Sequence, residues 1–364
     1  MNINYNGSVL AYRPKGSNAE WTPYNSSDSL NLTAPVELYT LAKDGNSFRI
    51  YTFKVNVHAT EGDSLYWKNC DTEVDALGEM TARRAVVMDG KLKVIGQTAS
   101  GVKLATRNDL TDDGSWTSTH ISGLPEEADI TTLFCQDNTL YTNTTDGRIF
   151  ESADGENWTE KGTQQSTPFT LLAKTEKNFY ALINGELMHS ADATIWEKEV
   201  LDDQPSLLPA SDMQALYLKQ NNGNNRLVLV GNRDSEKNST VWNKMWNKTI
   251  EEEEAEWMYI PLTADNKVPC PRLNNFTMFT YDGRIMAFGG ASQEGYGDHK
   301  AFDAIYFSND YGITWRKDNL MHLPYALEGS DCHFTAATDS NHFIWIIAGN
   351  QVWRGRLNRL GFER

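Results

Sequence analysis

Arginines at the starts of predicted strands are the side chains best suited to bind a ligand. Arg83 and Arg84 stand just before an apolar run, and Arg272 follows a proline-rich segment. A guanidinium group offers a planar fork of N–H donors that matches a carboxylate or a sulfate. Together with Arg233, these residues are candidates to bind an anionic group of a small ligand. The alternative is that they pair with neighbouring acids.

A second group of candidates lies in the loops before predicted strands and in a glycine-containing loop at 290–301. Their hydroxyl, carboxyl and imidazole groups can form hydrogen bonds with a polar ligand. The members of this group are Tyr296, His299, Tyr325, Asp331 and His333.

A long loop at 233–256 supplies the aromatic candidates. Trp242, Trp246 and Ile250 are spaced four residues apart, which predicts that they share one side of a short helix. The two indoles either cover the core or form an exposed platform on which a sugar ring can stack.

The sequence contains no local motif for a catalytic group. It lacks the patterns of a nucleophile elbow, a zinc-dependent hydrolase, a phosphate-binding loop and a dinucleotide-binding turn. The 7 histidines are dispersed, so we expect neither a metal site nor a cofactor. Glycoside hydrolysis needs two carboxylates about 5 to 9.5 Å apart, and no sequence pattern requires such a pair. We therefore assign no catalytic residue.

Composition narrows the range of partners. The 364 residues carry a formal net charge of −16, which argues against binding of nucleic acid or of an anionic membrane surface. No apolar run is long enough to span a bilayer, and residues 1–5 lack the features of a signal peptide. We expect a monomer, in a secreted, periplasmic or surface location, whose export signal lies outside this chain.

The four cysteines are widely spaced and form no metal-binding or redox pair. Buried free thiols are the expected state. The alternative is a disulfide that joins Cys332 to Cys70 or to Cys270; Cys135 completes the set.

Three turns of one type organise the strands around these candidates. In the pattern Ser-x-Asp-x-Gly-x-x-Trp, the Ser and Asp side chains can bond to turn amides, Gly accepts a positive φ, and Trp packs under the turn. Each carboxylate is therefore expected to be structural. The residues are Ser152, Asp154, Gly155 and Trp158, then Ser190, Asp192 and Trp196, and finally Ser308, Asp310, Gly312 and Trp315.

These turns resemble the Asp-box, or BNR, repeat of sialidase-like β-propellers. The segment Phe288-Gly289-Gly290, with Trp315 downstream, also resembles a kelch repeat. The whole pattern, to its end at 352–358, is similar to a bacterial propeller family of unknown function that is common in gut anaerobes. The resemblance implies a propeller and no particular activity. Phe48-Arg49-Ile50-Tyr51 is similar to the Phe-Arg-Ile-Pro stretch of sialidases but lacks the proline, so Arg49 is expected to be an ordinary strand residue.

The repeat predicts an all-β fold, a seven-bladed propeller formed by residues 1–364 as one domain. The closing blade is expected to combine C-terminal strands with an N-terminal strand near Trp21, which would remove exposed edges. A six-bladed ring is the alternative, if the first unit is not a true blade. The expected blades are 35–68, 84–118, 130–160, 168–198, 212–259, 276–317, and 333–360 together with 8–25.

A propeller has two faces. Turns between the first and second strands and between the third and fourth strands of each blade lie on one, here called the turn face. Connections between blades and loops between second and third strands lie on the other, here called the loop face. Because propellers generally bind ligands on the loop face, we expect a non-catalytic protein that binds a glycan, a peptide or a partner protein there. The alternative is a sialidase-like glycoside hydrolase or lyase.

Overall fold

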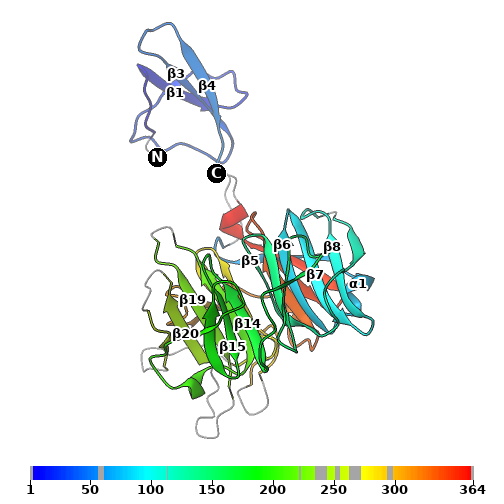
Figure 1. Ribbon diagram of the computed structural model, residues 1–364. Helices are drawn as coiled ribbons and strands as arrows, with labels where there is room; N and C mark the ends of the chain where they lie inside the picture. The colour runs from blue at the N-terminus through cyan, green and yellow to red at the C-terminus, as the bar shows by residue number, and fades with distance from the viewer. Residues whose placement is uncertain are drawn as a thin grey trace. The chain divides into compact units, whose positions relative to one another are not determined.

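The computed structural model describes residues 3–55, 61–112, 114–220, 223–233, 244–250, 255–261, 272–292 and 298–361 (Figure 1). The chain divides into two compact units, Met1–Glu61 and Gly62–Arg364. Seven four-stranded antiparallel sheets are present, and the all-β prediction is confirmed.

The first unit contains one of these sheets. Its strands lie in the order β2-β1-β3-β4, and few of its side chains are buried. The turn between the last two strands is held by Asp44, whose Oδ1 accepts the N–H groups of Asn46 and Ser47 at 2.9 and 3.0 Å. The strands are β1 Val9–Pro14, β2 Thr22–Pro23, β3 Val36–Leu41 and β4 Phe48–Phe53.

The second unit contains the other six sheets. Five of them consist of strands that are consecutive in sequence, and the first four of these five begin the ring. These are β6 Ala82–Met88, β7 Lys91–Thr98, β8 Gly101–Arg107 and β9 Trp116–His120; β10 Ala128–Gln136, β11 Thr139–Thr144, β12 Ile149–Ser152 and β13 Thr159–Lys161; β14 Phe169–Lys174, β15 Phe179–Ile183, β16 Glu186–Ser190 and β17 Glu197–Lys198; and β18 Ser211–Leu218, β19 Arg226–Asn232, β20 Lys244–Thr249 and β21 Met258–Tyr259.

The last two sheets complete the unit. One has the order β22-β23-β24-β25, and the other has the order β26-β27-β28-β5. Their strands are β22 Thr277–Tyr281, β23 Arg284–Phe288, β24 Tyr306–Ser308, β25 Arg316–Lys317, β26 Phe334–Thr338, β27 Ile344–Ala348, β28 Gln351–Leu357 and β5 Leu65–Asp71. The short helices are α1 Asp75–Gly78, η1 Pro205–Leu207, η2 Tyr325–Leu327 and η3 Asn358–Gly361.

The first strand of each of these six sheets is its inner strand. These strands contact one another in a closed cycle, in the order β6, β10, β14, β18, β22, β26 and back to β6. The second strands are covered on both faces by neighbouring blades, as the fully buried β15 and β27 show. The second unit is therefore a ring of six blades, as in the six-bladed alternative, and the seventh sheet belongs to the first unit.

The predicted closing strand is wrong. The outer strand of the last blade is β5, which pairs with β28 from Leu65↔Leu357 to Asp71↔Val352, whereas the strand after Trp21 pairs with β1. Trp67 lies opposite Gly355, where an added Cβ would approach its indole to 2.3 Å. Glycine is needed at this position so that the indole can lie on β28.

The first predicted blade, 35–68, is consequently divided. Its first two strands are β3 and β4 in the first unit, and its third strand is β5 in the second unit. The single domain predicted for 1–364 is likewise replaced by two compact units. A strand that follows a hairpin carries no local signal for the sheet in which it pairs, because each pairing depends on a partner far away in the sequence.

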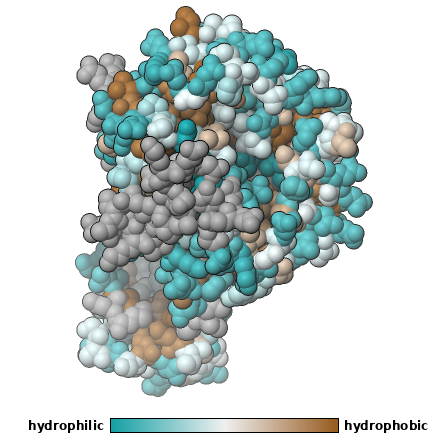
Figure 2. Space-filling view, turned by 90° about the horizontal axis from the view of Figure 1, so that it is seen from below, coloured by the Kyte–Doolittle hydropathy of each residue, from teal (hydrophilic) through white to brown (hydrophobic). Residues whose placement is uncertain are grey.

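The surface seen in Figure 2 is mostly hydrophilic, with apolar residues in small separate patches. Such a surface agrees with the strongly acidic composition. None of the helices in the described part of the chain is long and apolar enough to cross a membrane.

Candidate ligand-binding site

Arg83 lies at the start of β6, on the loop face. It is 5% exposed, and its guanidinium donates hydrogen bonds to the carbonyl oxygens of Met80 and Gly349. Burial lowers the pKa of Arg83 to about 10. These contacts join β6 to the loop between β27 and β28, so Arg83 is an internal anchor between the first and last blades of the ring.

Arg84 reaches the neighbouring inner strand. Its Nε and Nη2 atoms donate to the carbonyl oxygen of Thr131 in β10, at 3.1 and 2.6 Å. Burial lowers the pKa of Arg84, and the carboxylates of Asp129 and Asp212 act in the opposite direction. Arg84 therefore bridges two blades by hydrogen bonds to a backbone carbonyl oxygen, and the two acids act on it only through their charge.

Arg233 and Arg272 connect loops to one another. Arg272 is 1% exposed, and its Nη1 donates to the carbonyl oxygen of Arg233 at 3.1 Å. The Nη1 of Arg233 donates in turn to the carbonyl oxygen of Leu208 at 2.6 Å. This chain of contacts holds the proline-marked connection at Leu208 in place.

Trp246 is not part of a helix or of an exposed platform. It lies in strand β20, is 0% exposed, and donates its indole N–H to the carbonyl oxygen of Leu207 at 3.0 Å. The spacing that suggested a helical face was misleading because both faces of β20 are covered by neighbouring blades. Trp242 and Tyr296 lie outside the described residues.

The remaining candidates are exposed or half-buried. His299 Nδ1 lies 3.3 Å from the hydroxyl of Tyr306, and Tyr325 is 73% exposed and stacks on His322. Asp331 and His333 are exposed. The described residues therefore do not gather the predicted ligand-binding side chains into one pocket on the loop face.

The turns on the opposite face have the predicted hydrogen bonds. In the turn after β12, Ser152 Oγ accepts the Gly155 N–H at 2.8 Å, and Trp158 Nε1 donates to the Gly155 carbonyl at 3.0 Å. Desolvation opposes ionisation of Asp154, but hydrogen bonds, led by that from the backbone N–H of Asn157, lower its pKa to about 2.

The turn after β24 is built in the same way, whereas in the turn after β16 the Trp196 indole N–H has no hydrogen-bond partner among the described residues. Ser308 Oγ accepts the N–H of Gly312 at 2.8 Å, and Trp315 Nε1 donates to the Gly312 carbonyl at 3.0 Å. Asp192 Oδ1 accepts the Thr194 N–H at 2.8 Å. These carboxylates are occupied by the turns, as predicted for structural residues.

A pocket of about 490 Å³ opens on the turn face, where the inner strands of three blades end. We call it the inner-rim pocket. It is lined by the ends of β10, β18 and β22, by the turn before β23 and by the turn after β24. The lining residues are Gln136, Asp137, Tyr217, Leu218, Lys219, Gln220, Thr280, Tyr281, Asp282, Gly283, Arg284, Ile285, Ser308, Asn309 and Tyr311.

Ion pairs fix the charged part of this lining. Lys219 Nζ lies 2.8 Å from Asp137 and 3.2 Å from Glu176, so one ammonium joins the turns of three blades. Its hydrogen bond lowers the pKa of Asp137, and the two carboxylates raise the pKa of Lys219. Arg284 lies 3.2 Å from Asp282.

Tyrosines form the rest of the wall. The Tyr311 hydroxyl donates to Gln220 Oε1 at 3.3 Å, and the guanidinium of Arg226 lies 5.0 Å from the Tyr311 ring centre. Tyr281 is buried beneath the pocket, where its hydroxyl donates to the carbonyl oxygen of His342 at 2.8 Å.

This pocket was not predicted from the sequence, because the turns on this face were expected to be structural alone. A signal was available: the ends of three inner strands carry long polar or aromatic residues, such as Tyr217 and Lys219, where a compact turn would need only small residues.

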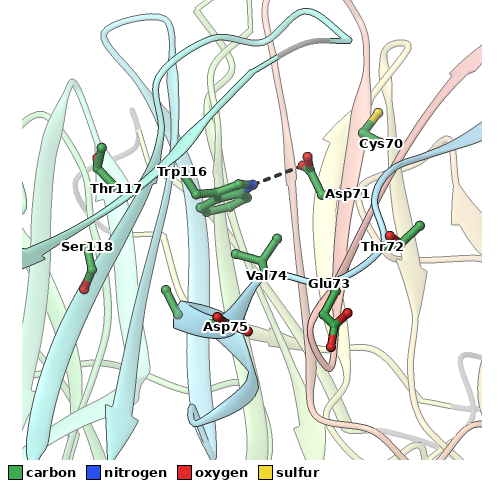
Figure 3. Close-up of a pocket in the computed structure, with 10 residues that line it drawn as sticks. Cys70, Asp71, Thr72, Glu73, Val74, Asp75, Trp116, Thr117 and Ser118 are labelled. Carbon is green, nitrogen blue, oxygen red and sulfur yellow. Dashed lines mark hydrogen bonds between the residues drawn. The ribbon is translucent and has the colours of Figure 1, made fainter.

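A second pocket, of about 550 Å³, lies where the first and last blades of the ring meet; we call it the outer-seam pocket (Figure 3). It is lined by residues 70–76, between β5 and α1, and by the start of β9. Trp116 donates its indole N–H to Asp71 Oδ2 at 3.0 Å. Asp71 also accepts the Nε of the fully buried Arg107 at 3.0 Å, so it has a structural role.

The first unit has a pocket of its own, of about 500 Å³. Its walls are the segment before β1 and parts of β3 and β4, including Arg49 and Tyr51. Arg49 is an exposed strand residue, as its position after a turn predicted.

The carboxyl groups whose pKa is clearly shifted do not have the environment of a general acid. A general acid at neutral pH needs a raised pKa. Every aspartate or glutamate in the described ranges with a clear shift has a lowered pKa instead. No group of three metal-ligating side chains occurs there either.

The cysteines of the described ranges are free. Cys70, Cys135 and Cys332 are half-buried thiols, which excludes a bridge from Cys70 to Cys332. Cys270 lies outside the described residues.

Comparisons with known proteins support the fold. Residues 61–364 match the model of the DUF6242 beta propeller domain. The solved structure of YjhT has a TM-score of 0.50 at 11% identity, over 78% of this chain and 95% of that one. An α-L-arabinanase from Penicillium chrysogenum, solved with arabinobiose, has a TM-score of 0.45 at 10% identity, over 78% of this chain and 95% of its own. A search of curated proteins gave no match. At this identity the similarity to YjhT shows a shared fold alone.

Proposed function

The chain belongs to the DUF6242 β-propeller family, and we propose that it is a binding protein that holds a polar ligand in the inner-rim pocket without hydrolysing it. The observation that carries the proposal is the convergence of three inner-strand ends on one cavity. Its volume of about 490 Å³ falls in the range of small-molecule sites, and it combines aromatic walls with a few placed polar groups.

The carboxyl groups favour binding over hydrolysis. Asp137 is held ionised by Lys219, and Asp282 is paired with Arg284, so neither is suited to protonate a leaving group. The loop face, by contrast, uses its arginines to join blades and loops. We therefore place the proposed ligand on the turn face.

The test is a ligand-observed NMR screen with a mixed library of oligosaccharides, dipeptides and nucleosides, beside an assay with 4-nitrophenyl glycosides. The Lys219→Glu variant would place a third carboxylate between Asp137 and Glu176 and should abolish binding of the hits. Lys198→Glu, which alters the exposed pair with Glu186, is the matched control. Hits that bind both variants equally, or release of 4-nitrophenol, would overturn the proposal.

A further inference from the structure

The inner-rim pocket has balanced charge. Two carboxylates, from Asp137 and Glu176, flank the Lys219 ammonium. On the other side, Arg284 and Arg359 both contact the carboxylate of Asp282. Arg359 also pairs with Asp63, so this second side is neutral. The excess negative charge of the first side is offset by the Arg226 guanidinium, which lies against the Tyr311 ring, so the pocket as a whole favours neither an anion nor a cation.

The aromatic walls suit a ligand with apolar faces. Tyr217 and Tyr311 are half-buried and belong to different blades. Tyrosine offers a flat apolar surface together with a polar hydroxyl. The C–H faces of a sugar ring can pack on such rings, while its hydroxyl groups extend toward polar neighbours.

Neutral hydrogen-bonding groups complete the lining. Because Gln220 accepts the Tyr311 hydroxyl through Oε1, its amide nitrogen remains available to donate. The side chains of Thr280 and Asn309 are exposed at the rim. A hydroxyl can both donate and accept, so a molecule rich in hydroxyl groups can match this mixture of amides and hydroxyls.

We infer, resting on the proposed function, that the ligand of the inner-rim pocket is an uncharged saccharide, whose ring stacks on Tyr217 and whose hydroxyl groups bond to Gln220 and Thr280. A charged ligand would have to displace an ion pair that is already formed. A saccharide can use the amide and hydroxyl groups and leave those pairs intact.

The test is isothermal titration of the full chain with neutral oligosaccharides of glucose, mannose, galactose and xylose, at 50 and 500 mM NaCl. At least one should bind, with an affinity that changes less than twofold with salt, because no ion pair forms with the ligand. Tyr217→Ala should weaken binding at least tenfold. Tyr66→Ala, which removes a 68% exposed tyrosine of β5 outside the pocket, should have no effect.

A second variant covers the case in which Tyr217→Ala fails to fold. Thr280→Val removes one exposed hydroxyl at nearly constant volume and should weaken binding severalfold. If no neutral oligosaccharide binds, or if binding is indifferent to Tyr217→Ala and Thr280→Val, the inference is wrong. If only dipeptides or uronic-acid oligosaccharides bind, with strong salt dependence and sensitivity to Lys219→Glu, the saccharide inference falls while the proposed function stands.

Discussion

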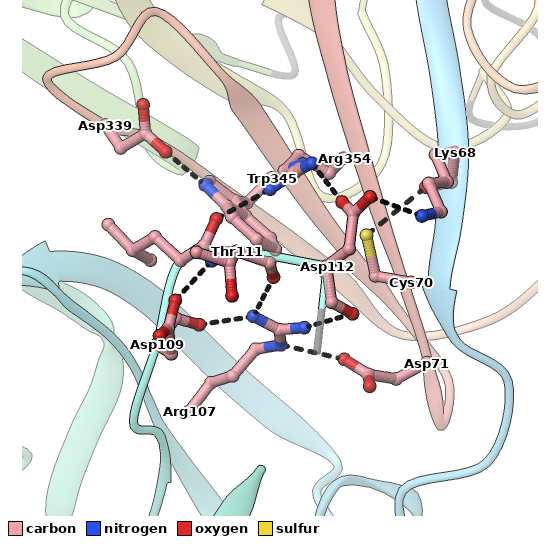
Figure 4. Close-up of polar contacts among 11 residues, drawn as sticks. Lys68, Cys70, Asp71, Arg107, Asp109, Thr111, Asp112, Asp339, Trp345 and Arg354 are labelled. Atoms are coloured by element: carbon pink, nitrogen blue, oxygen red, sulfur yellow. Dashed lines mark hydrogen bonds and ion pairs between the residues drawn. The ribbon is translucent and has the colours of Figure 1, made fainter. Parts of the chain in front are cut away.

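Arg107 should be the most costly single polar residue to remove from the closure of the ring (Figure 4). It is 0% exposed, and its Nε donates to Asp71 in the closing strand β5. Its other nitrogens donate to the carbonyl oxygens of Asp109, Thr111 and Asp112. One guanidinium therefore holds β5 and the β8–β9 turn together.

The expected cost of Arg107→Met follows from these contacts. Removing one partner of a buried ion pair costs about 3 to 5 kcal/mol. Asp71 keeps the Trp116 N–H and its side chain is 18% exposed, while the freed carbonyl groups belong to exposed residues that water can reach. We therefore expect the lower end, about 3 kcal/mol, or a fall in Tm of about 5 °C.

Calorimetric unfolding of Arg107→Met and of a control on the same strand would test this. Lys103→Met breaks the exposed pair between Lys103 and Glu79, which has the same 3.0 Å separation, and should cost less than about 1 kcal/mol. Hydrogen exchange in β5 should accelerate in Arg107→Met alone. Equal losses of Tm in both variants would refute the assigned role of Arg107.

Three further predictions concern the same ring. Glu199→Ala should cost about 3 to 5 kcal/mol in denaturant unfolding, because it leaves the buried Lys248 ammonium, now 2.7 Å from the carboxylate, without a counter-charge. Gly355→Ala should loosen β5 and lower Tm, because its Cβ would meet the Trp67 indole at 2.3 Å. Asp154→Ala should destabilise the protein by about 1 kcal/mol at pH 7, since solvent screens the partly exposed group, and by about half as much near pH 2, where the folded-state carboxyl is half protonated. The sign follows from a lowered pKa: its stabilisation is present above pH 3.8 and is lost as the pH falls through about 2.

Each of these has a comparison within the chain. Glu186→Ala breaks an exposed pair and should be nearly neutral beside Glu199→Ala. Gly78→Ala introduces a Cβ that only reaches 3.8 Å from its nearest neighbour, so a loss equal to that of Gly355→Ala would argue against the steric explanation. A stability difference for Asp154→Ala that persists undiminished at pH 2 would contradict its assignment to carboxylate ionisation.

The sequence alone predicts those features of the fold that depend on residues close together in the chain. The hydrogen bonds around Asp154 and Asp310 are made within one turn, so residue types and spacing alone predict them. The apolar runs that became β7 and β23 are equally local, since each is bounded by an Asp-Gly turn with positive φ at Asp89 and Asp282.

The sequence did not predict those features of the fold and of the site that depend on contacts between residues far apart in the chain. The pairing of β5 with β28 joins residues nearly three hundred positions apart, and only the glycine opposite Trp67 hinted at it. Trp246 has helical spacing but lies in a strand that is covered on both faces. The inner-rim pocket gathers Asp137, Lys219 and Arg284 from three blades, and no local sequence pattern predicts that grouping.

Hydrogen exchange measured by mass spectrometry, with and without a saturating neutral oligosaccharide, tests the ligand site most directly. Protection should be confined to the segments that contain Asp137, Tyr217–Gln220, Thr280–Ile285 and Ser308–Tyr311. Protection at the loop face around Arg84 and Thr131, with none at the inner-rim pocket, would contradict the central claim that the ligand lies on the turn face.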